Sequence, residues 1–415
     1  MSEAATRVPH ATPPPRILSI DLLRGASVLL MLFVNEVAGV AGAPAFLRHK
    51  GAADDAMTIT DLVFPSFLFV VGMAIPFALG ARLRGGQARA AALRHVVRRA
   101  AALVVIGVLM VNAEHGVPGW LSVPAWNVLM TLGVLLAWAS PREGFARVPG
   151  SWLRAAGVAL LLFVAIAYRG ADATGWLHLR PHWWGILGLI GWAYLGVATA
   201  YWVAGDRPAV LTGLLGLYGC VALADGAGGF GWPTIPGPLV GGIVGTHGAV
   251  VLAGTLLGVL LIRHQHERGS PWRFALEMLG YAGALATAGL LLHTLAGVDR
   301  AFTISKIHAT LPWGLLSAAL TCAAWVLVFV VVDVLGRAHL PRLLVIAGQN
   351  PLLAYLMAPF LLSLFALAAP LSQGRNLYEA LSQPMGVGLV RSAVFAWLVV
   401  RLSGFLRTRG LRFQL

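Results

Sequence analysis

The chain has 415 residues, of which 58% are hydrophobic and only 11% charged, and its formal net charge is +14. Soluble globular domains carry about 25% charged residues, so this composition excludes an ordinary soluble enzyme, a disordered chain and a secreted disulfide-rich domain. It predicts an all-α polytopic membrane protein. Cys220 and Cys322 both lie inside apolar runs and are interpreted as packing residues, with no disulfide or metal pattern.

The chain divides into three predicted parts. Residues 1–16 are Pro-rich and are expected to be a disordered cytoplasmic N-terminus, residues 17–406 a single transmembrane helical domain, and residues 407–415 a basic cytoplasmic tail. Apolar runs recur throughout and predict about 11–12 membrane-spanning helices, eleven being left open because the third, fourth and seventh are short or weakly bounded. The twelve predicted spans are 17–40, 61–82, 98–113, 124–140, 152–168, 183–204, 208–225, 246–262, 273–296, 310–336, 341–369 and 389–406.

The first span has an alternative interpretation. A cleaved signal peptide would also be apolar here, and the small residues 41–43 that follow fit a cleavage site. Asp21 and Arg24 at the start of the run are unusual in a signal peptide and favour a retained span.

The basic residues support the predicted topology. With both termini cytoplasmic, 20 of the 30 Lys and Arg residues fall on the cytoplasmic side, 7 on the outer side and 3 within spans. Such an excess is typical of cytoplasmic loops, so the positive charge indicates topology and no nucleic-acid partner. The inner loop 83–97 is expected to be solvated and to face lipid headgroups, and the Gly/Pro-rich outer loop 226–245 is expected to be irregular.

Polar side chains inside or beside the spans are candidate site residues, because burying them in hydrocarbon is costly. Asp21 and Arg24 are three residues apart on one helix face. They form either an internal ion pair that stabilises the helix or a charged wall of a polar cavity. Asn35, late in the same span, is either an interhelical hydrogen-bonding residue or a site residue.

A histidine and a carboxylate flank the second span. His49 lies in the predicted outer loop, and Asp61 begins the span. A carboxylate at this depth can orient an imidazole that the loop brings back, and an oriented imidazole can act as general base or nucleophile. A solvated loop histidine without a catalytic role is the alternative.

Two later segments add further candidates. Residues 306–313 enter the tenth span from the same outer face as His49 and include Lys306, His308 and Trp313. Residues 348–351, with Asn350 before a proline, break the eleventh span near its middle. Such a break at membrane depth is tolerated only beside protein or a water-filled cavity. The histidines lack metal-ligand spacing, so no metal is expected.

Several of these segments together resemble the transmembrane acyltransferase family of heparan-α-glucosaminide N-acetyltransferase and its bacterial relatives. The resemblance extends over about residues 15–360 and is densest in the first 75. It is carried by Ser19-Ile-Asp21-Leu-Leu-Arg24-Gly25, Phe33-Val-Asn35 and the run from Met57 to Gly72, and more loosely by residues 183–194, residues 306–313, Asp333 and residues 348–355.

The resemblance implies a membrane enzyme that transfers acetyl from cytoplasmic acetyl-CoA to an amino or hydroxyl group of a sugar or glycan on the outer face. It implies that His49 is catalytic, either as base for direct transfer or as a covalently acetylated nucleophile. We assign Asp61 to orienting His49, Asn35 to the acyl carbonyl, and the cationic inner residues, including Arg82, Arg84 and Arg89, to attracting the CoA phosphates.

This chain also departs from the pattern of the relatives closest to the lysosomal enzyme. Those relatives have a tryptophan shortly after the histidine, where this chain reads Gly-Ala-Ala-Asp-Asp, and an asparagine where this chain has Ser305. The departures bear on the acceptor more than on the chemistry. The residues expected to be catalytic are His49 and Asp61, and those expected to bind substrate are Asn35, Asp21, Arg24, Lys306, His308, Trp313 and Asn350.

The predicted partners are acetyl-CoA as co-substrate, a sugar or glycan acceptor and the lipid bilayer, and a homodimer is left open. Arg outnumbers Lys 28 to 2, which suggests a GC-rich bacterium and hence its inner membrane. A transporter or permease for a small polar solute is the main alternative function, since broken helices and buried charge also suit that class. A purely structural membrane protein is a third.

Overall fold

The computed structural model describes residues 17–117, 121–141, 149–170, 178–230, 239–337, 342–372, 376–409 and 411–413. The predicted N-terminus 1–16, three residues of the predicted tail and the middle of the outer loop 226–245 therefore lie outside the described residues. The helices are α1 Leu18–Val37, α2 Ile59–Ile75, α3 Ala81–Arg84, α4 Arg89–His115, α5 Val123–Trp138, α6 Gly150–Ala167, α7 Gly185–Ala204, α8 Pro208–Gly226, α9 Gly248–Glu267, α10 Pro271–His293, α11 Leu311–Phe329, α12 Arg342–Gln349, α13 Pro351–Ala368, α14 Leu377–Ala380 and α15 Met385–Thr408.

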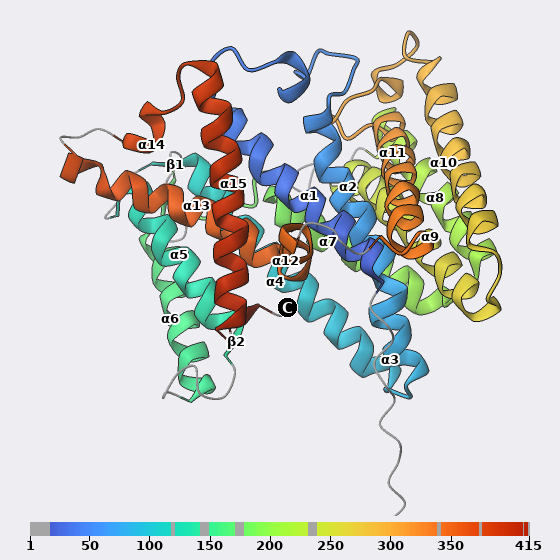
Figure 1. The fold of residues 1–415 in the computed structure, drawn as a ribbon, viewed down its shortest axis with the longest axis horizontal. Coiled ribbons are helices and arrows are strands. Elements are labelled where there is room, and N and C mark those ends of the chain that lie inside the picture. Colours follow the sequence, from blue (N-terminus) through green and yellow to red (C-terminus); the bar gives the residue numbers. More distant parts are fainter. Residues whose placement is uncertain are drawn as a thin grey trace, which may run out of the picture.

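The chain folds as a helical bundle (Figure 1). Within the described residues, eleven helical segments are long and apolar enough to cross a membrane, and α5 is a shorter apolar helix. Short strand pairings join β1 (Gly116–Val117) to β3 (Arg169–Gly170) and β2 (Ala139–Pro141) to β4 (Leu411–Phe413). The predicted all-α polytopic membrane class is thus confirmed, and each of the twelve predicted spans coincides with a helix or, for 341–369, with α12 and α13.

Glycines set the closest helix contacts at the centre of the bundle. A methyl group on Gly72 of α2 would lie 1.9 Å from the Val251 carbonyl oxygen of α9, so these two backbones touch. At the α1–α12 contact, a methyl on Gly25 would lie 1.8 Å from the Leu344 carbonyl oxygen. Small residues allow this approach in membrane bundles, and the second contact fixes α12, and with it Asn350, against α1.

Two predicted loops are shorter in the structure than the sequence indicated. The inner loop 83–97 is mostly helical, because α4 begins at Arg89. Its Ala, Arg and Leu residues favour helix, and the Arg89 guanidinium donates to the Trp202 carbonyl at 2.7 Å while lying 4.8 Å from that indole ring. The loop 226–245 ends in a π-helical segment, Leu239–His247, that precedes α9.

The break in the eleventh span is present but lies nearer its start than its middle. α12 has 8 residues and α13 has 18, with Asn350 between them in a non-helical conformation. The ring of Pro351 is tolerated at the first position of α13 because that position needs no amide donor.

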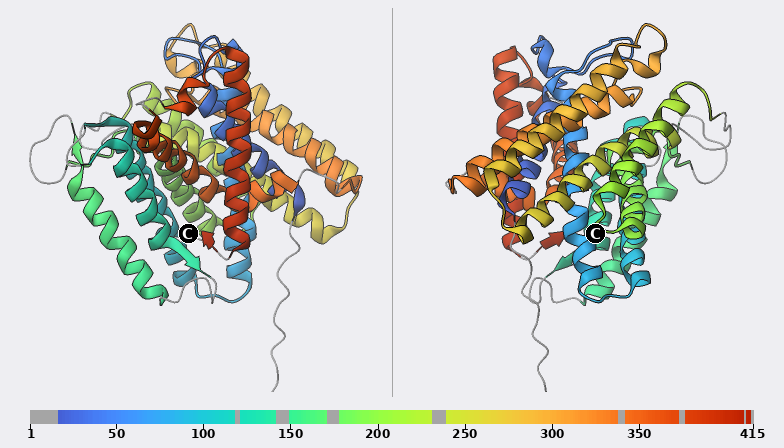
Figure 2. Two further views of the ribbon diagram at one scale, coloured as in Figure 1. Left: turned by 60° about the vertical axis from the view of Figure 1, so that its left-hand side comes forward. Right: turned by 90° about the vertical axis from the view of Figure 1, so that its right-hand side faces the viewer.

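The α1–α2 connection (residues 38–58) and the α10–α11 connection (residues 294–310) lie at the same end of the bundle (Figures 1 and 2). They are joined there by a hydrogen bond from the Ile304 amide to Asp55 Oδ1 at 2.7 Å. His308 Nε2 also lies 3.0 Å from the Ala52 carbonyl oxygen. These contacts bring the two predicted outer segments together.

Candidate active site

The N-terminus of α2 fixes the position of Asp61. Thr58 is the N-cap residue and Asp61 the third residue of the helix, and together they form a capping box. Asp61 Oδ2 accepts hydrogen bonds from the Thr58 amide at 3.1 Å and from the Lys50 amide at 3.2 Å. The side chain is 1% exposed, so its second oxygen, Oδ1, is held in one direction.

His49 meets that second oxygen. Its Nδ1 lies 2.7 Å from Asp61 Oδ1, and the imidazole is 41% exposed. An ionised carboxylate can only accept hydrogen bonds, so Nδ1 carries the hydrogen and Nε2 keeps its lone pair. This arrangement matches the nucleophile or base with an orienting carboxylate that acyl transfer requires. The structure places the Asp61 carboxylate against the His49 ring, and a role of this pair in catalysis stays a prediction.

Lys306 supplies a positive charge at the same ring. Its Nζ lies 3.1 Å from Nδ1 and 3.4 Å from Nε2 of His49. Burial lowers the pKa of Lys306, and the neighbouring Asp61 carboxylate opposes that shift. An ammonium group here can donate to an oxygen that develops negative charge beside Nε2. We refer to Asp61, His49 and Lys306 as the outer triad.

His308 supports the connection that carries Lys306. Its ring contacts the Arg300 guanidinium and the Ala52 carbonyl oxygen, and its amide donates to Ser305 Oγ at 3.4 Å. The His308 ring has no hydrogen bond to the outer triad among the described residues. It therefore holds the two connections together instead of lying at the reacting atoms.

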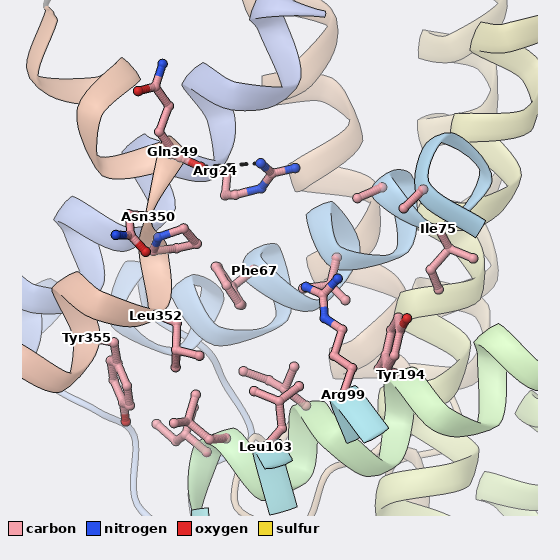
Figure 3. Close-up of a pocket in the computed structure, with 18 of the residues that line it drawn as sticks. Arg24, Phe67, Ile75, Arg99, Leu103, Tyr194, Gln349, Asn350, Leu352 and Tyr355 are labelled. Atoms are coloured by element: carbon pink, nitrogen blue, oxygen red, sulfur yellow. Dashed lines mark hydrogen bonds between the residues drawn. The ribbon is translucent and has the colours of Figure 1, made fainter. Parts of the chain in front are cut away.

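A separate cavity of about 500 Å³ lies between α1, α2, α4, α7, α12 and α13. Figure 3 shows Arg24 and Asn350 on one side of it and Arg99 and Tyr194 on the other. Arg24 donates to the Asp21 carboxylate at 3.0 Å and to the Gly348 carbonyl at 3.3 Å. The Asn350 side chain is buried, and its Nδ2 has no hydrogen-bond partner among the described residues.

Three arginines and a histidine line this cavity, namely Arg24, Arg82, Arg99 and His95. Arg82 and Arg99 form no salt bridge with a carboxylate of the described chain, and Arg99 stacks on the Tyr194 ring at 5.1 Å. An anionic ligand would find uncompensated positive charge here.

The other two arginines of the predicted CoA-attracting set lie elsewhere. Arg84 pairs with Asp206 at 2.7 Å, and Arg89 is bound to Trp202. Neither lines the cavity, so of the three named arginines only Arg82 has the predicted surroundings.

The predicted residues therefore separate into groups. His49, Asp61 and Lys306 meet directly, while Arg24 and Asn350 line the cavity and Asp21 forms the ion pair with Arg24. Three do not join either group, His308 being the first, since it holds the two connections together. The Asn35 side chain is exposed and forms no hydrogen bond within the described chain. Trp313 is fully buried, with its ring 6.0 Å from that of His247.

Neither His49 nor Asp61 lines the cavity. Phe67, which does, lies six residues after Asp61 on α2, a rise of about 9 Å along the helix. The sequence did not single out His95, Arg99, Tyr194 or Tyr355 as cavity residues. Three of them were visible only as polar residues inside predicted spans, such as Tyr355 four residues after Pro351, and His95 only as a residue of the predicted inner loop 83–97.

Part of the chain is similar in sequence to known proteins. Residues 16–211 match the family described as heparan-alpha-glucosaminide N-acetyltransferase, catalytic. The chain is 34% identical over 123 residues to human heparan-alpha-glucosaminide N-acetyltransferase, which covers 29% of this chain and 18% of the human protein. The mouse protein of the same name is 33% identical over 121 residues, with the same shares. The match thus spans less than a fifth of these curated relatives. Over residues 16–211, the chain is thus similar to the catalytic region described for heparan-alpha-glucosaminide N-acetyltransferase.

Proposed function

We propose that the protein is a membrane acyltransferase that moves an acetyl group from acetyl-CoA to an amino or hydroxyl group of a sugar or glycan. The observation that carries the proposal is the outer triad, in which a buried carboxylate orients a half-exposed imidazole beside an ammonium group. The family match supports the same reaction class.

His49 Nε2 performs the central step by one of two routes. As a base, it removes the proton from the acceptor N–H or O–H while the acceptor atom attacks the thioester carbonyl. The C–S bond then breaks, and the imidazolium returns the proton to the CoA sulfur. As a nucleophile, Nε2 itself attacks and the C–S bond breaks, which releases CoA as the thiolate. The acceptor then displaces the imidazole from the acetyl group, and its proton passes to the freed Nε2 and from there to the thiolate.

Asp61 and Lys306 assist both routes. Asp61 holds the hydrogen on Nδ1 and stabilises the imidazolium as it forms. Lys306 Nζ, 3.4 Å from Nε2, is within reach of the carbonyl oxygen of an acetyl group at Nε2. Its charge stabilises the tetrahedral oxyanion.

The cavity between α1, α2, α4, α7, α12 and α13 is the proposed acetyl-CoA site. Arg82, Arg99 and Arg24 would bind the phosphates, and Asn350 has an unused amide donor for a carbonyl of the pantetheine arm. The thioester would have to move beyond Phe67 toward Asp61, because the cavity ends short of the outer triad. In the predicted topology the phosphates lie toward the cytoplasm, and the acceptor arrives at the outer face of a bacterial inner membrane.

The test is transfer of labelled acetyl from acetyl-CoA to glucosamine-containing acceptors by purified protein in proteoliposomes. The wild type is expected to transfer label, and His49→Ala is expected to abolish transfer. His266→Ala, on an exposed part of α9, is the matched control and should retain it. Full transfer by His49→Ala would overturn the assignment. Accumulation of unmodified sugar in the vesicles, without covalent transfer, would favour a transporter instead.

A further inference from the structure

A second hollow lies on the membrane-facing side of the outer triad. It is a groove of about 700 Å³ between α2, α10 and α11, within the range of about 300–1,000 Å³ typical of small-molecule sites. We refer to it as the lateral groove. It is lined by Phe46, Met57, Thr58, Ile59, Leu62, Leu279, Ala282, Gly283, Ala286, Leu316, Ala319, Leu320 and Ala323.

One end of the lateral groove is built from the connection that carries His49. Phe46 lies three residues before His49, and Met57 and Thr58 close the same connection. Thr58 both lines the groove and donates through its hydroxyl to Asp61 Oδ2 at 3.1 Å. The groove and the outer triad therefore share Thr58 as a wall, and a molecule in the groove would have one end beside the connection that carries His49.

The rest of the groove offers only hydrocarbon contacts. Twelve of its lining side chains are apolar, Thr58 being the exception, and Leu279 and Leu320 are 45% and 50% exposed at its rim. The floor is made of small residues such as Ala286 and Ala323, and no atom lies within 4 Å of the position of a Cβ on Gly283. These residues belong to candidate membrane spans, so the groove faces the bilayer.

We propose that the acceptor is lipid-linked: its sugar reaches the outer triad while its hydrocarbon anchor lies in the lateral groove. This inference rests on the proposed acetyl transfer and names the class of acceptor. A water-soluble sugar would use none of the groove. A hydrocarbon anchor that enters the groove from the bilayer is held there by van der Waals packing, because lipid tails are as apolar as the groove. The sugar at its end is then held at the depth of Thr58.

The test compares two probes that differ only in the anchor, octadecyl glucosaminide and methyl glucosaminide, as acetyl acceptors in proteoliposomes. Gly283→Leu fills the groove. Gly280→Leu is the matched control, because Gly280 is also exposed on α10 with open space at its Cβ but does not line the groove. Partitioning of the long-chain probe into the bilayer is the same for all three proteins, so the comparison cancels it.

The wild type is expected to prefer the octadecyl probe in kcat/KM. Gly283→Leu should reduce that preference about tenfold, or about 1.4 kcal/mol, because the leucine side chain occupies the space that the anchor would fill, whereas Gly280→Leu should keep it. An unreduced preference in Gly283→Leu, or an equal reduction in both variants, would overturn the inference. Equal loss of both acceptors in Gly283→Leu alone would identify an ordinary structural lipid and would overturn it as well.

A second readout separates this inference from the proposed reaction. A diazirine-bearing octadecyl glucosaminide should crosslink to α10 or α11 in the wild type and in Gly280→Leu, and much less in Gly283→Leu, without any turnover. No transfer from acetyl-CoA to either probe, with crosslinking intact, would count against the acetyl transfer and not against the groove. Acetyl transfer without crosslinking in the groove would count against the groove and not against the acetyl transfer.

Discussion

Replacing Asp61 with asparagine tests the outer triad with little change in shape. Oδ2 of Asp61 accepts from two backbone amides, Thr58 and Lys50, so the asparagine must keep its carbonyl oxygen there. Its NH₂ group then takes the place of Oδ1, 2.7 Å from His49 Nδ1. Facing a donor, Nδ1 becomes the acceptor, and the hydrogen moves to Nε2.

With its hydrogen on Nε2, His49 has no lone pair at that atom and cannot act there as a base or a nucleophile. In serine proteases the equivalent change lowers kcat about 10⁴-fold, and general base catalysis is typically worth about 10²–10⁴-fold. For Asp61→Asn we therefore expect a fall in kcat of about 10²–10⁴-fold, or about 3–5 kcal/mol in the activation free energy. The loss of negative charge at the start of α2 should cost only about 0.3–1 kcal/mol of stability.

The assay is initial-rate transfer of labelled acetyl, normalised to the amount of monodisperse protein, with a thermal melt of each variant. Asp54→Asn is the matched control, since Asp54 lies in the same connection but accepts from the Gly51 amide at 2.8 Å and not from His49. A correctly folded Asp61→Asn protein with activity within about threefold of wild type would refute the reasoning about the tautomer.

Three further predictions concern the ammonium group, the cavity and the packing. Because burial lowers the pKa of Lys306, it loses its charge at a lower pH than an ordinary lysine. Activity should therefore fall as pH rises through that lowered pKa, and Lys306→Arg should move the fall to higher pH; an unmoved pH–kcat/KM profile would contradict the role. Arg82→Gln should raise KM for acetyl-CoA about tenfold at low salt and less at high salt. Arg84→Gln, outside the cavity, should leave KM unchanged. Equal KM values for the two variants in kinetic titrations would count against the cavity as the acetyl-CoA site. Gly72→Ala places a methyl 1.9 Å from an α9 carbonyl and should lower stability by about 1–3 kcal/mol, while Gly280→Ala, with open space, should not lower Tm. Equal melting temperatures would refute the close contact.

The sequence predicted well what depends on local pattern. Long apolar runs indicated the helices, and Asp61 was predicted to begin the second span; it lies in the first turn of α2. The pairing of Asp21 with Arg24 also follows from a spacing of three within one helix. These features need no knowledge of which helices are neighbours.

Features that depend on helix rotation and on distant contacts could not be predicted. α1 and α4 are apolar over much of their surface, so hydropathy does not say which face turns toward a cavity. The Asn35 side chain, predicted to be a site residue, is exposed, whereas Arg99, at the start of the predicted span 98–113, lines the cavity. The contact between α12 and α1, which positions Asn350, depends on two glycines more than 300 residues apart, Gly25 and Gly348.

A structure of the protein in a lipid nanodisc with acetyl-CoA bound would test whether the cavity delivers the thioester to His49. We predict that the CoA phosphates contact Arg82 and Arg99. The thioester carbonyl carbon should lie about 3–3.5 Å from His49 Nε2, with its oxygen directed to Lys306. Acetyl-CoA bound outside the cavity would contradict the proposed acetyl-CoA site. Acetyl-CoA bound in the cavity with a thioester that cannot reach His49 would contradict the proposed role of His49.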